Sequence, residues 1–118
     1  MEKPKNKTDI LIDVIAKKAP NLSWVPTMKS DTFQVSLSDY ILKIEKKEGP
    51  LSQDISKYIF SICDAKGEKI DVISGTEGLG SLDKLIKLKK IFDEGRRKAL
   101  CADEAINNIL KEMAKKYK

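Results

Sequence analysis

The chain offers few side chains for acid–base, nucleophilic or metal chemistry. Its 118 residues include no histidine, which removes the commonest general base, neutral-pH proton switch and metal ligand. The two cysteines, Cys63 and Cys101, lie far apart in sequence and form no zinc-binding or disulfide-scaffold pattern. Without a histidine partner, neither thiol has a base to activate it as a nucleophile. We therefore expect reduced thiols, no metal and no cofactor.

Paired carboxylates are the remaining candidates for catalysis. The pairs Asp93-Glu94 and Asp103-Glu104 fall on expected helix surfaces beside basic residues. General acid–base catalysis needs a carboxyl group that is desolvated in a pocket, and both solvent and neighbouring cations work against this. The sequence therefore predicts that the protein is not an enzyme.

A glycine-rich segment, residues 75–80, joins an expected strand to an expected helix, a place where backbone amides can hold a phosphate. Its glycines match neither the G-x-G-x-x-G nor the G-x-x-x-x-G-K-[ST] pattern, because Ser81-Leu82 follows where lysine and a hydroxyl residue are required. Glu77 and Asp83 would also repel a phosphate. We interpret the segment as a flexible connector.

Positive charge is concentrated at the two ends of the chain, and the middle is acidic. Residues 1–30 carry six Lys against three acids, residues 31–80 six Lys against nine acids, and residues 81–118 eleven Lys and Arg against six acids. The three net charges are therefore +3, −3 and +5. A basic end can attract nucleic acid, an anionic membrane or an acidic protein, although a solvated lysine-rich surface has the same composition. The candidate contacts lie on one expected helix: Lys84, Lys87, Lys89, Lys90, Arg96, Arg97 and Lys98.

Hydrophobic periodicity predicts an α+β fold. Residues 9–18 have helical spacing, and Asn6 or Thr8 is placed to cap that helix. Apolar and polar residues then alternate over residues 32–37, 40–45, 58–63 and 69–74, which predicts four strands. The segment Asp64-Ala-Lys-Gly67 is typical of a tight hairpin turn. Because every connection is too short for a parallel crossover, we expect a four-stranded antiparallel meander.

Two further helices are expected after residue 81. Apolar residues recur at helical spacing over residues 85–92, and Gly95 inside that pattern indicates close packing. The last helix begins at Asp103, and we expect the two helices to form a hairpin. This hairpin and the N-terminal helix should pack on one face of the sheet, in a single domain of residues 1–118 with 1–7 as a candidate disordered segment. The stripe of the last helix predicted to be buried is Ile106, Ile109, Leu110 and Met113.

Strand alternation assigns side chains to the two faces of the sheet. The opposite face would expose Ile41, Ile59 and Ile73 among polar residues, either as a dimer patch or as the ordinary apolar fraction of a surface. Trp24 lies in the connector after the first helix and is either a lid on the core or an aromatic at a binding surface. These four residues are the candidate interface. The face under the helices is predicted to carry Phe33, Val35, Leu42, Ile44, Phe60, Ile62 and Val72.

The segment Ile91–Leu110 resembles the tail of small uncharacterised bacterial proteins, some of them carried by mobile elements. An N-terminal helix, a connector containing Trp24 and a first strand beginning Thr32-Phe33 extend the likeness over most of the chain. At positions 95 and 101 those proteins are expected to carry Ala and Gly, whereas this chain has Gly95 and Cys101. The resemblance implies a bacterial protein with this order of elements, and it implies no activity.

These patterns favour a non-enzymatic protein–protein interaction or regulatory module, with a homodimer as one option. Non-specific nucleic-acid binding through the basic helix of residues 84–98 is the alternative. The N-terminal residues are not followed by the apolar region of a signal peptide, and no apolar run is long enough to span a membrane. We therefore expect a cytoplasmic protein that does not bind membranes.

Overall fold

The structure, a computed structural model, describes residues 6–48, 56–78, 80 and 82–116. Residues 1–5 of the segment expected to be disordered lie outside these ranges, and the first helix begins at Lys7. A short 3₁₀ turn, η1 (Ala19–Asn21), follows that helix. The other elements are α1 (Lys7–Lys18), β1 (Val25–Pro26), β2 (Thr32–Ser36), β3 (Tyr40–Glu48), β4 (Ser56–Asp64), β5 (Lys69–Thr76), α2 (Leu82–Ala99) and α3 (Ala102–Lys116).

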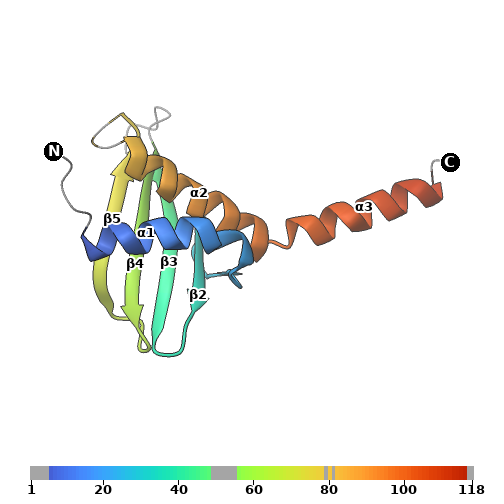
Figure 1. The fold of residues 1–118 in the computed structure, drawn as a ribbon. Coiled ribbons are helices and arrows are strands. Elements are labelled where there is room, and N and C mark those ends of the chain that lie inside the picture. The colour runs from blue at the N-terminus through green and yellow to red at the C-terminus, as the bar shows by residue number, and fades with distance from the viewer. Residues whose placement is uncertain (1–5, 49–55, 79, 81, 117–118) are drawn as a thin grey trace.

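The strands form one antiparallel sheet in the order β1-β2-β3-β4-β5, and α1 and α2 lie together on one of its faces (Figure 1). The predicted α+β class and antiparallel meander are confirmed, with one strand more than expected. The additional strand is β1, in which Val25 pairs with Gln34 and Pro26 with Phe33. Proline is tolerated in a strand at the edge of a sheet. Because β1 has only two residues and one of them is Pro26, the sequence shows no strand pattern there.

Two local turns form as their sequences predict. The Asn6 side chain caps α1 by accepting a hydrogen bond from the amide of Asp9 at 2.8 Å. In the hairpin between β4 and β5, the amide of Gly67 donates to the carbonyl of Asp64 at 3.0 Å. The Asp64 carboxylate also accepts from the amide of Lys66 at 2.9 Å, and Gly67 adopts the left-handed conformation with φ 89°. Local backbone chemistry therefore sets these turns.

Helix α2 is the element on which the core is built, because it contacts all five strands as well as α1. The ring of Phe92 lies between two aromatic rings of the sheet, 5.6 Å from the centroid of Phe33 and 5.7 Å from that of Tyr58. At Gly95, an added Cβ would lie 3.3 Å from Cδ2 of Trp24 and 3.5 Å from Cγ2 of Ile44. The close packing predicted at Gly95 is therefore confirmed: a side chain there would hold α2 away from the sheet.

The predicted facing of β5 is wrong. Val72 was expected in the core and Ile73 on the opposite face, but Val72 is 45% exposed and Ile73 is 7% exposed within the core cluster, paired with Phe60. The cause is a β-bulge at Ile62 and Cys63, where β5 contributes one residue more than β4. Because strand side chains alternate with a period of two, one extra residue exchanges the faces of every residue beyond it.

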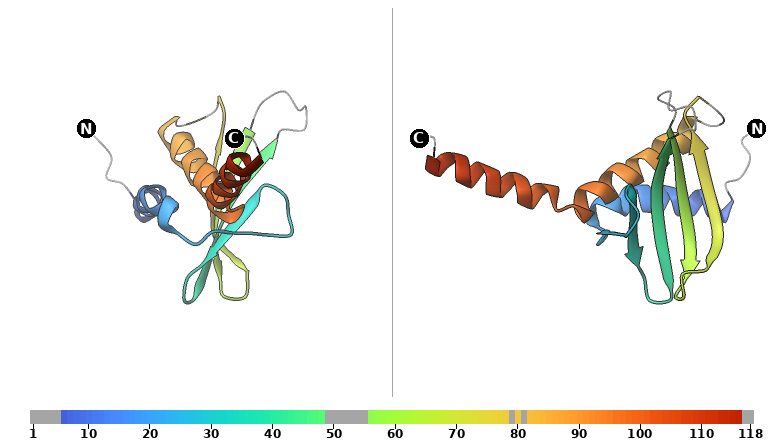
Figure 2. Two further views of the ribbon diagram at one scale, coloured as in Figure 1. Left: turned by 90° about the vertical axis from the view of Figure 1, so that its right-hand side faces the viewer. Right: turned by 180° about the vertical axis from the view of Figure 1, so that it is seen from behind.

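The predicted packing of a C-terminal hairpin on the sheet is also wrong. Helix α2 ends at Ala99, and α3 then projects away from the rest of the molecule (Figures 1 and 2). Of the described elements, α3 contacts only α2. The amide of Cys101 donates to the carbonyl of Lys98, Cys101 has φ 52°, and its own carbonyl accepts from the amide of Ala105. A two-residue turn of this kind ends one helix and starts the next, and it does not bring α3 back over the sheet.

The contact at Gly95 leads to the first prediction. Gly95→Leu should lower the free energy of unfolding by about 2 kcal/mol or more, because methylene groups forced into a packed core cost about 1–3 kcal/mol. Lys90→Leu, on the exposed side of the same helix, should change it by less than about 0.5 kcal/mol. Urea denaturation followed by circular dichroism measures both. Equal stability of the two variants would show that α2 does not need glycine at this contact.

Candidate functional site

The most conspicuous surface feature is an apolar stripe on α3, made by four side chains that recur at intervals of three and four residues. The prediction that this stripe packs in the core is wrong. The helical spacing is present, but the helix side of the sheet is covered by α1 and α2. The exposed fractions are 47% for Ile106, 54% for Ile109, 61% for Leu110 and 54% for Met113.

The stripe is bordered by charged residues. Lys116 and Glu112 form an exposed ion pair with a nitrogen-to-oxygen distance of 3.5 Å, one turn apart. Together with Ile109 and Met113 they line a shallow hollow of about 180 Å³ on the side of the helix. Apolar side chains flanked by charged ones suit the side chains of another amphipathic element. None of the described helices is both long and apolar enough to cross a membrane.

Lys87, a member of the candidate basic set of α2, is engaged within the fold. The Lys87 ammonium group forms ion pairs with Asp13 of α1 and, at 2.9 Å, with Asp83 of its own helix. Hydrogen bonds to these carboxylates raise the pKa of Lys87 to about 12, so it is charged at neutral pH. Lys87 therefore joins α1 to α2 and is poorly placed to contact a phosphate.

The other six cations do not share one face of α2. At about 100° per residue, Lys90 and Arg97 lie on the side opposite the core, while Lys89 and Arg96 lie on one flank. Lys84 and Lys98 fall on the flank that carries Lys87 and faces α1. Acidic residues lie among them, and the exposed members of the set are Lys89, Lys90, Arg96, Arg97 and Lys98. The structure thus spreads this charge around the exposed arc of the helix.

Trp24, a candidate interface residue, belongs to the core. It is 2% exposed, it packs against Gly95, and its indole Nε1–H donates to the carbonyl of Ala19 at 3.1 Å. The lid interpretation is therefore correct and the binding-surface interpretation is wrong. Burial of both the ring and its polar atom leaves nothing for a partner to contact.

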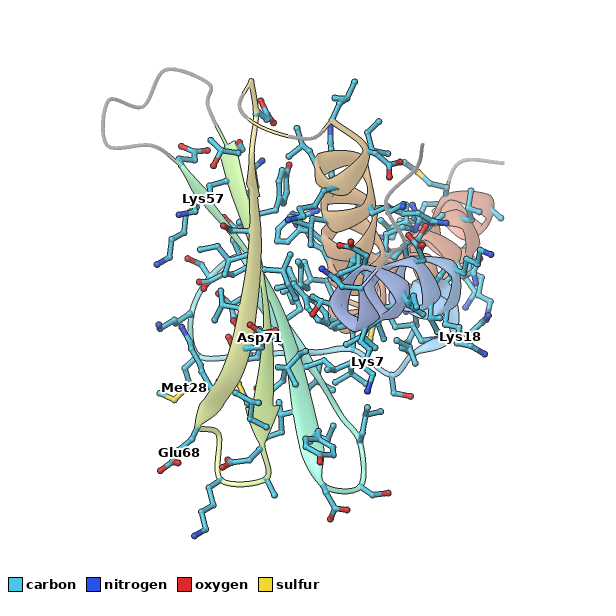
Figure 3. The ribbon with its side chains drawn as sticks, turned by 60° about the vertical axis from the view of Figure 1, so that its left-hand side comes forward. Lys7, Lys18, Met28, Lys57, Glu68 and Asp71 are labelled. Atoms are coloured by element: carbon cyan, nitrogen blue, oxygen red, sulfur yellow. The ribbon has the colours of Figure 1, made fainter. Side chains whose placement is uncertain are left out.

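The proposed isoleucine patch on the other face of the sheet is not assembled. Ile73 lies in the core, and Ile59 is only 9% exposed. Ile41 pairs with Cys63, and Ile59 pairs with Glu45. The polar pair Lys43 and Ser61 lies between these two pairs and separates the isoleucines. Figure 3 shows Met28 and Lys57 on this side of the sheet, away from α1 and α2. The face presents separated apolar side chains among polar ones.

A shallow pocket of about 250 Å³ on that face is lined largely by polar side chains. Three lysines and one glutamate contribute mixed charge, and the hydroxyl of Thr27 is used by the backbone, because it donates to the carbonyl of Thr32 at 2.9 Å. The hydroxyl of Thr32 likewise donates to a backbone carbonyl, that of Ser30, at 3.4 Å. Its charged residues are Lys29, Lys43, Glu45 and Lys69.

Groups suited to catalysis do not gather in the part of the chain that the structure describes. Cys63 is buried and Cys101 is exposed at the turn between α2 and α3. Burial, and then the charges of Asp93 and Glu77, raise the pKa of Tyr58, which keeps the phenol neutral. Across residues 6–48, 56–78, 80 and 82–116, no three acidic or cysteine side chains come together in a way that could hold a metal ion.

No protein-family model, curated protein or solved structure matches the chain. Among the surfaces compared above, the stripe of α3 is the one where large apolar side chains gather on an element that packs against little else.

Proposed function

We propose that the protein is a non-enzymatic interaction module and that it binds another protein through the apolar stripe of α3, defined by Ile106, Ile109, Leu110 and Met113. The observation that carries this proposal is the exposure of all four side chains, between 47% and 61%, on a helix that extends away from the domain. Burying such a stripe removes apolar surface from water, which is the main driving force of protein association.

The energetics of a lone helix support the proposal. An isolated helix of 12–15 residues is marginal in water, because most helical stability in proteins comes from packing of the apolar face. Helix α3 has 15 residues and little tertiary contact, so a partner that covers the stripe would also stabilise the helix itself. Recognition of an amphipathic helix by a groove or by another helix is a common mode of protein binding.

The charge of α3 favours a protein partner over a membrane surface. Helices that lie on membranes carry an excess of Lys and Arg on the polar face. Residues 102–116 carry three lysines and three acids, so their net charge is zero, and they include no aromatic side chain. A balanced polar face gains little from anionic lipids and suits complementary ion pairs with a protein.

The absence of enzymatic activity remains part of the proposal. It is supported by the composition, which lacks histidine, and by the dispersion of carboxylates over the described surface. The domain of α1, α2 and the sheet then serves as a rigid base that presents α3.

A photo-crosslinking experiment tests the proposed surface without assuming which protein binds it. A photoreactive phenylalanine derivative at Met113, in the stripe, should crosslink to protein in the native host cell, because the stripe is covered there. The same group at Lys111, exposed on the opposite side of α3, should give far weaker adducts. Equal or absent crosslinking from both positions would contradict the proposal, and the mass of each adduct reports the partner.

A second candidate function is non-specific nucleic-acid binding. It is favoured by the exposure of Lys89, Lys90 and Arg96 on one stretch of α2. Mobile surface cations of this kind can neutralise phosphates without reading the sequence. Against it stand the ion pairs that engage Lys87 and the acids interspersed along the helix.

Titration with duplex DNA and with RNA at two salt concentrations tests this candidate. If it is correct, the wild type binds at low salt, and each neutralised phosphate of B-DNA adds about −0.9 to the slope of log affinity against log salt. The double variant Lys89→Glu/Lys90→Glu should then bind more weakly and have a shallower slope. The matched control is Lys66→Glu in the hairpin turn distant from α2, and absence of binding by the wild type at low salt rules the candidate out.

A further inference from the structure

We propose that the partner covering the stripe of α3 is a second copy of this chain, with the two α3 helices antiparallel. The inference rests on the proposed function and names the partner of the same surface. In a symmetric dimer one patch contacts its own copy, so the stripe must be complementary to itself. Apolar side chains at intervals of three and four residues, as in the stripe, form the seam of paired helices.

The charge along α3 favours the antiparallel arrangement. Residues 102–108 carry two acids and no base, whereas residues 109–116 carry three lysines and one glutamate, so the halves have net charges of −2 and +2. Paired helices lie about 8–10 Å apart, which is close to the screening length at physiological salt. Parallel pairing would align halves of like charge, and antiparallel pairing aligns each acidic half with a basic half.

The shape of the molecule favours the same arrangement. Seen nearly along its own axis, α3 projects in front of the domain rather than beside it, with α1 on one side and the sheet on the other (Figure 2, left). Two parallel α3 helices about 10 Å apart would therefore drive their domains into each other. Antiparallel helices place the two domains at opposite ends of the pair, where they do not collide.

Small side chains next to the stripe permit close approach of a second helix. Ala105 and Ala114 lie on its two borders and are exposed. Leu100, 50% exposed in the turn, adds apolar surface at the base of α3. The seam is only about 22 Å long for 15 residues, so the dimer should be weak and concentration-dependent.

Sedimentation equilibrium over micromolar to submillimolar concentrations tests self-association of the full chain. The wild type should pass from monomer to dimer, and Ile109→Lys should remain monomeric. The matched control Asn108→Lys, which adds the same charge to the adjacent and outward position, should still dimerise.

The native Cys101 provides a test of orientation. Cys63 is buried, so a nitroxide label attaches to the exposed Cys101. In an antiparallel pair, two labels at the N-terminal end of α3 should lie about 20 Å or more apart, and in a parallel pair about 10–15 Å. Mixing this protein with a Cys101→Ser/Lys115→Cys copy should give the shorter distance only if the helices are antiparallel.

The outcomes separate the inference from the function on which it rests. A dimer that survives Ile109→Lys, or short distances between Cys101 labels, would overturn the inference. A strictly monomeric wild type whose stripe crosslinks to a different protein would overturn it and leave the proposed function standing. A monomer that binds vesicles of phosphatidylcholine and phosphatidylserine in equal parts through α3, with no protein crosslink from the stripe, would overturn both.

Discussion

The contact between α2 and the sheet is the constraint on which the rest of the molecule depends. Phe92 fills the space between Phe33 and Tyr58, and Gly95 lets the helix approach Trp24. Lys87 joins α1 to α2, and these two helices together cover the helix side of the sheet. No room is left there for α3. The last helix therefore does not pack on that side of the sheet, and its apolar stripe stays exposed.

In the proposed function, different side chains serve stability and binding. The buried side chains that hold the domain together come from α1, the sheet, α2 and the connector that carries Trp24, and none of the core cluster comes from α3. Loss of the stripe should therefore affect association without unfolding the domain. A short helix that gains its packing only in a complex also couples its own order to binding, which lowers affinity and makes the contact reversible.

Local sequence patterns predict the turns and caps of this chain. They do not predict which side of the sheet a strand residue faces or whether a helix packs on the sheet. The cap at Asn6, the turn at Gly67 and the close contact at Gly95 follow from residues adjacent in sequence or from one missing side chain. The facing of Ile73 depends on a bulge that alternation cannot reveal. The apolar stripe containing Ile109 is present on α3 as its spacing predicts. That spacing is the same whether the stripe packs on the chain's own sheet or on another molecule. The position of α1 and α2 on the sheet shows that the sheet does not cover this stripe.

We propose that a partner, and not the chain's own core, covers α3. Amide hydrogen exchange measured separately for α2 and α3 over a range of protein concentrations tests it most directly. Protection in α3 should be slight in dilute protein and rise with concentration, while protection in α2 stays constant. Strong protection of α3 at the lowest concentration would contradict the account, because it would mean that the domain itself buries the helix.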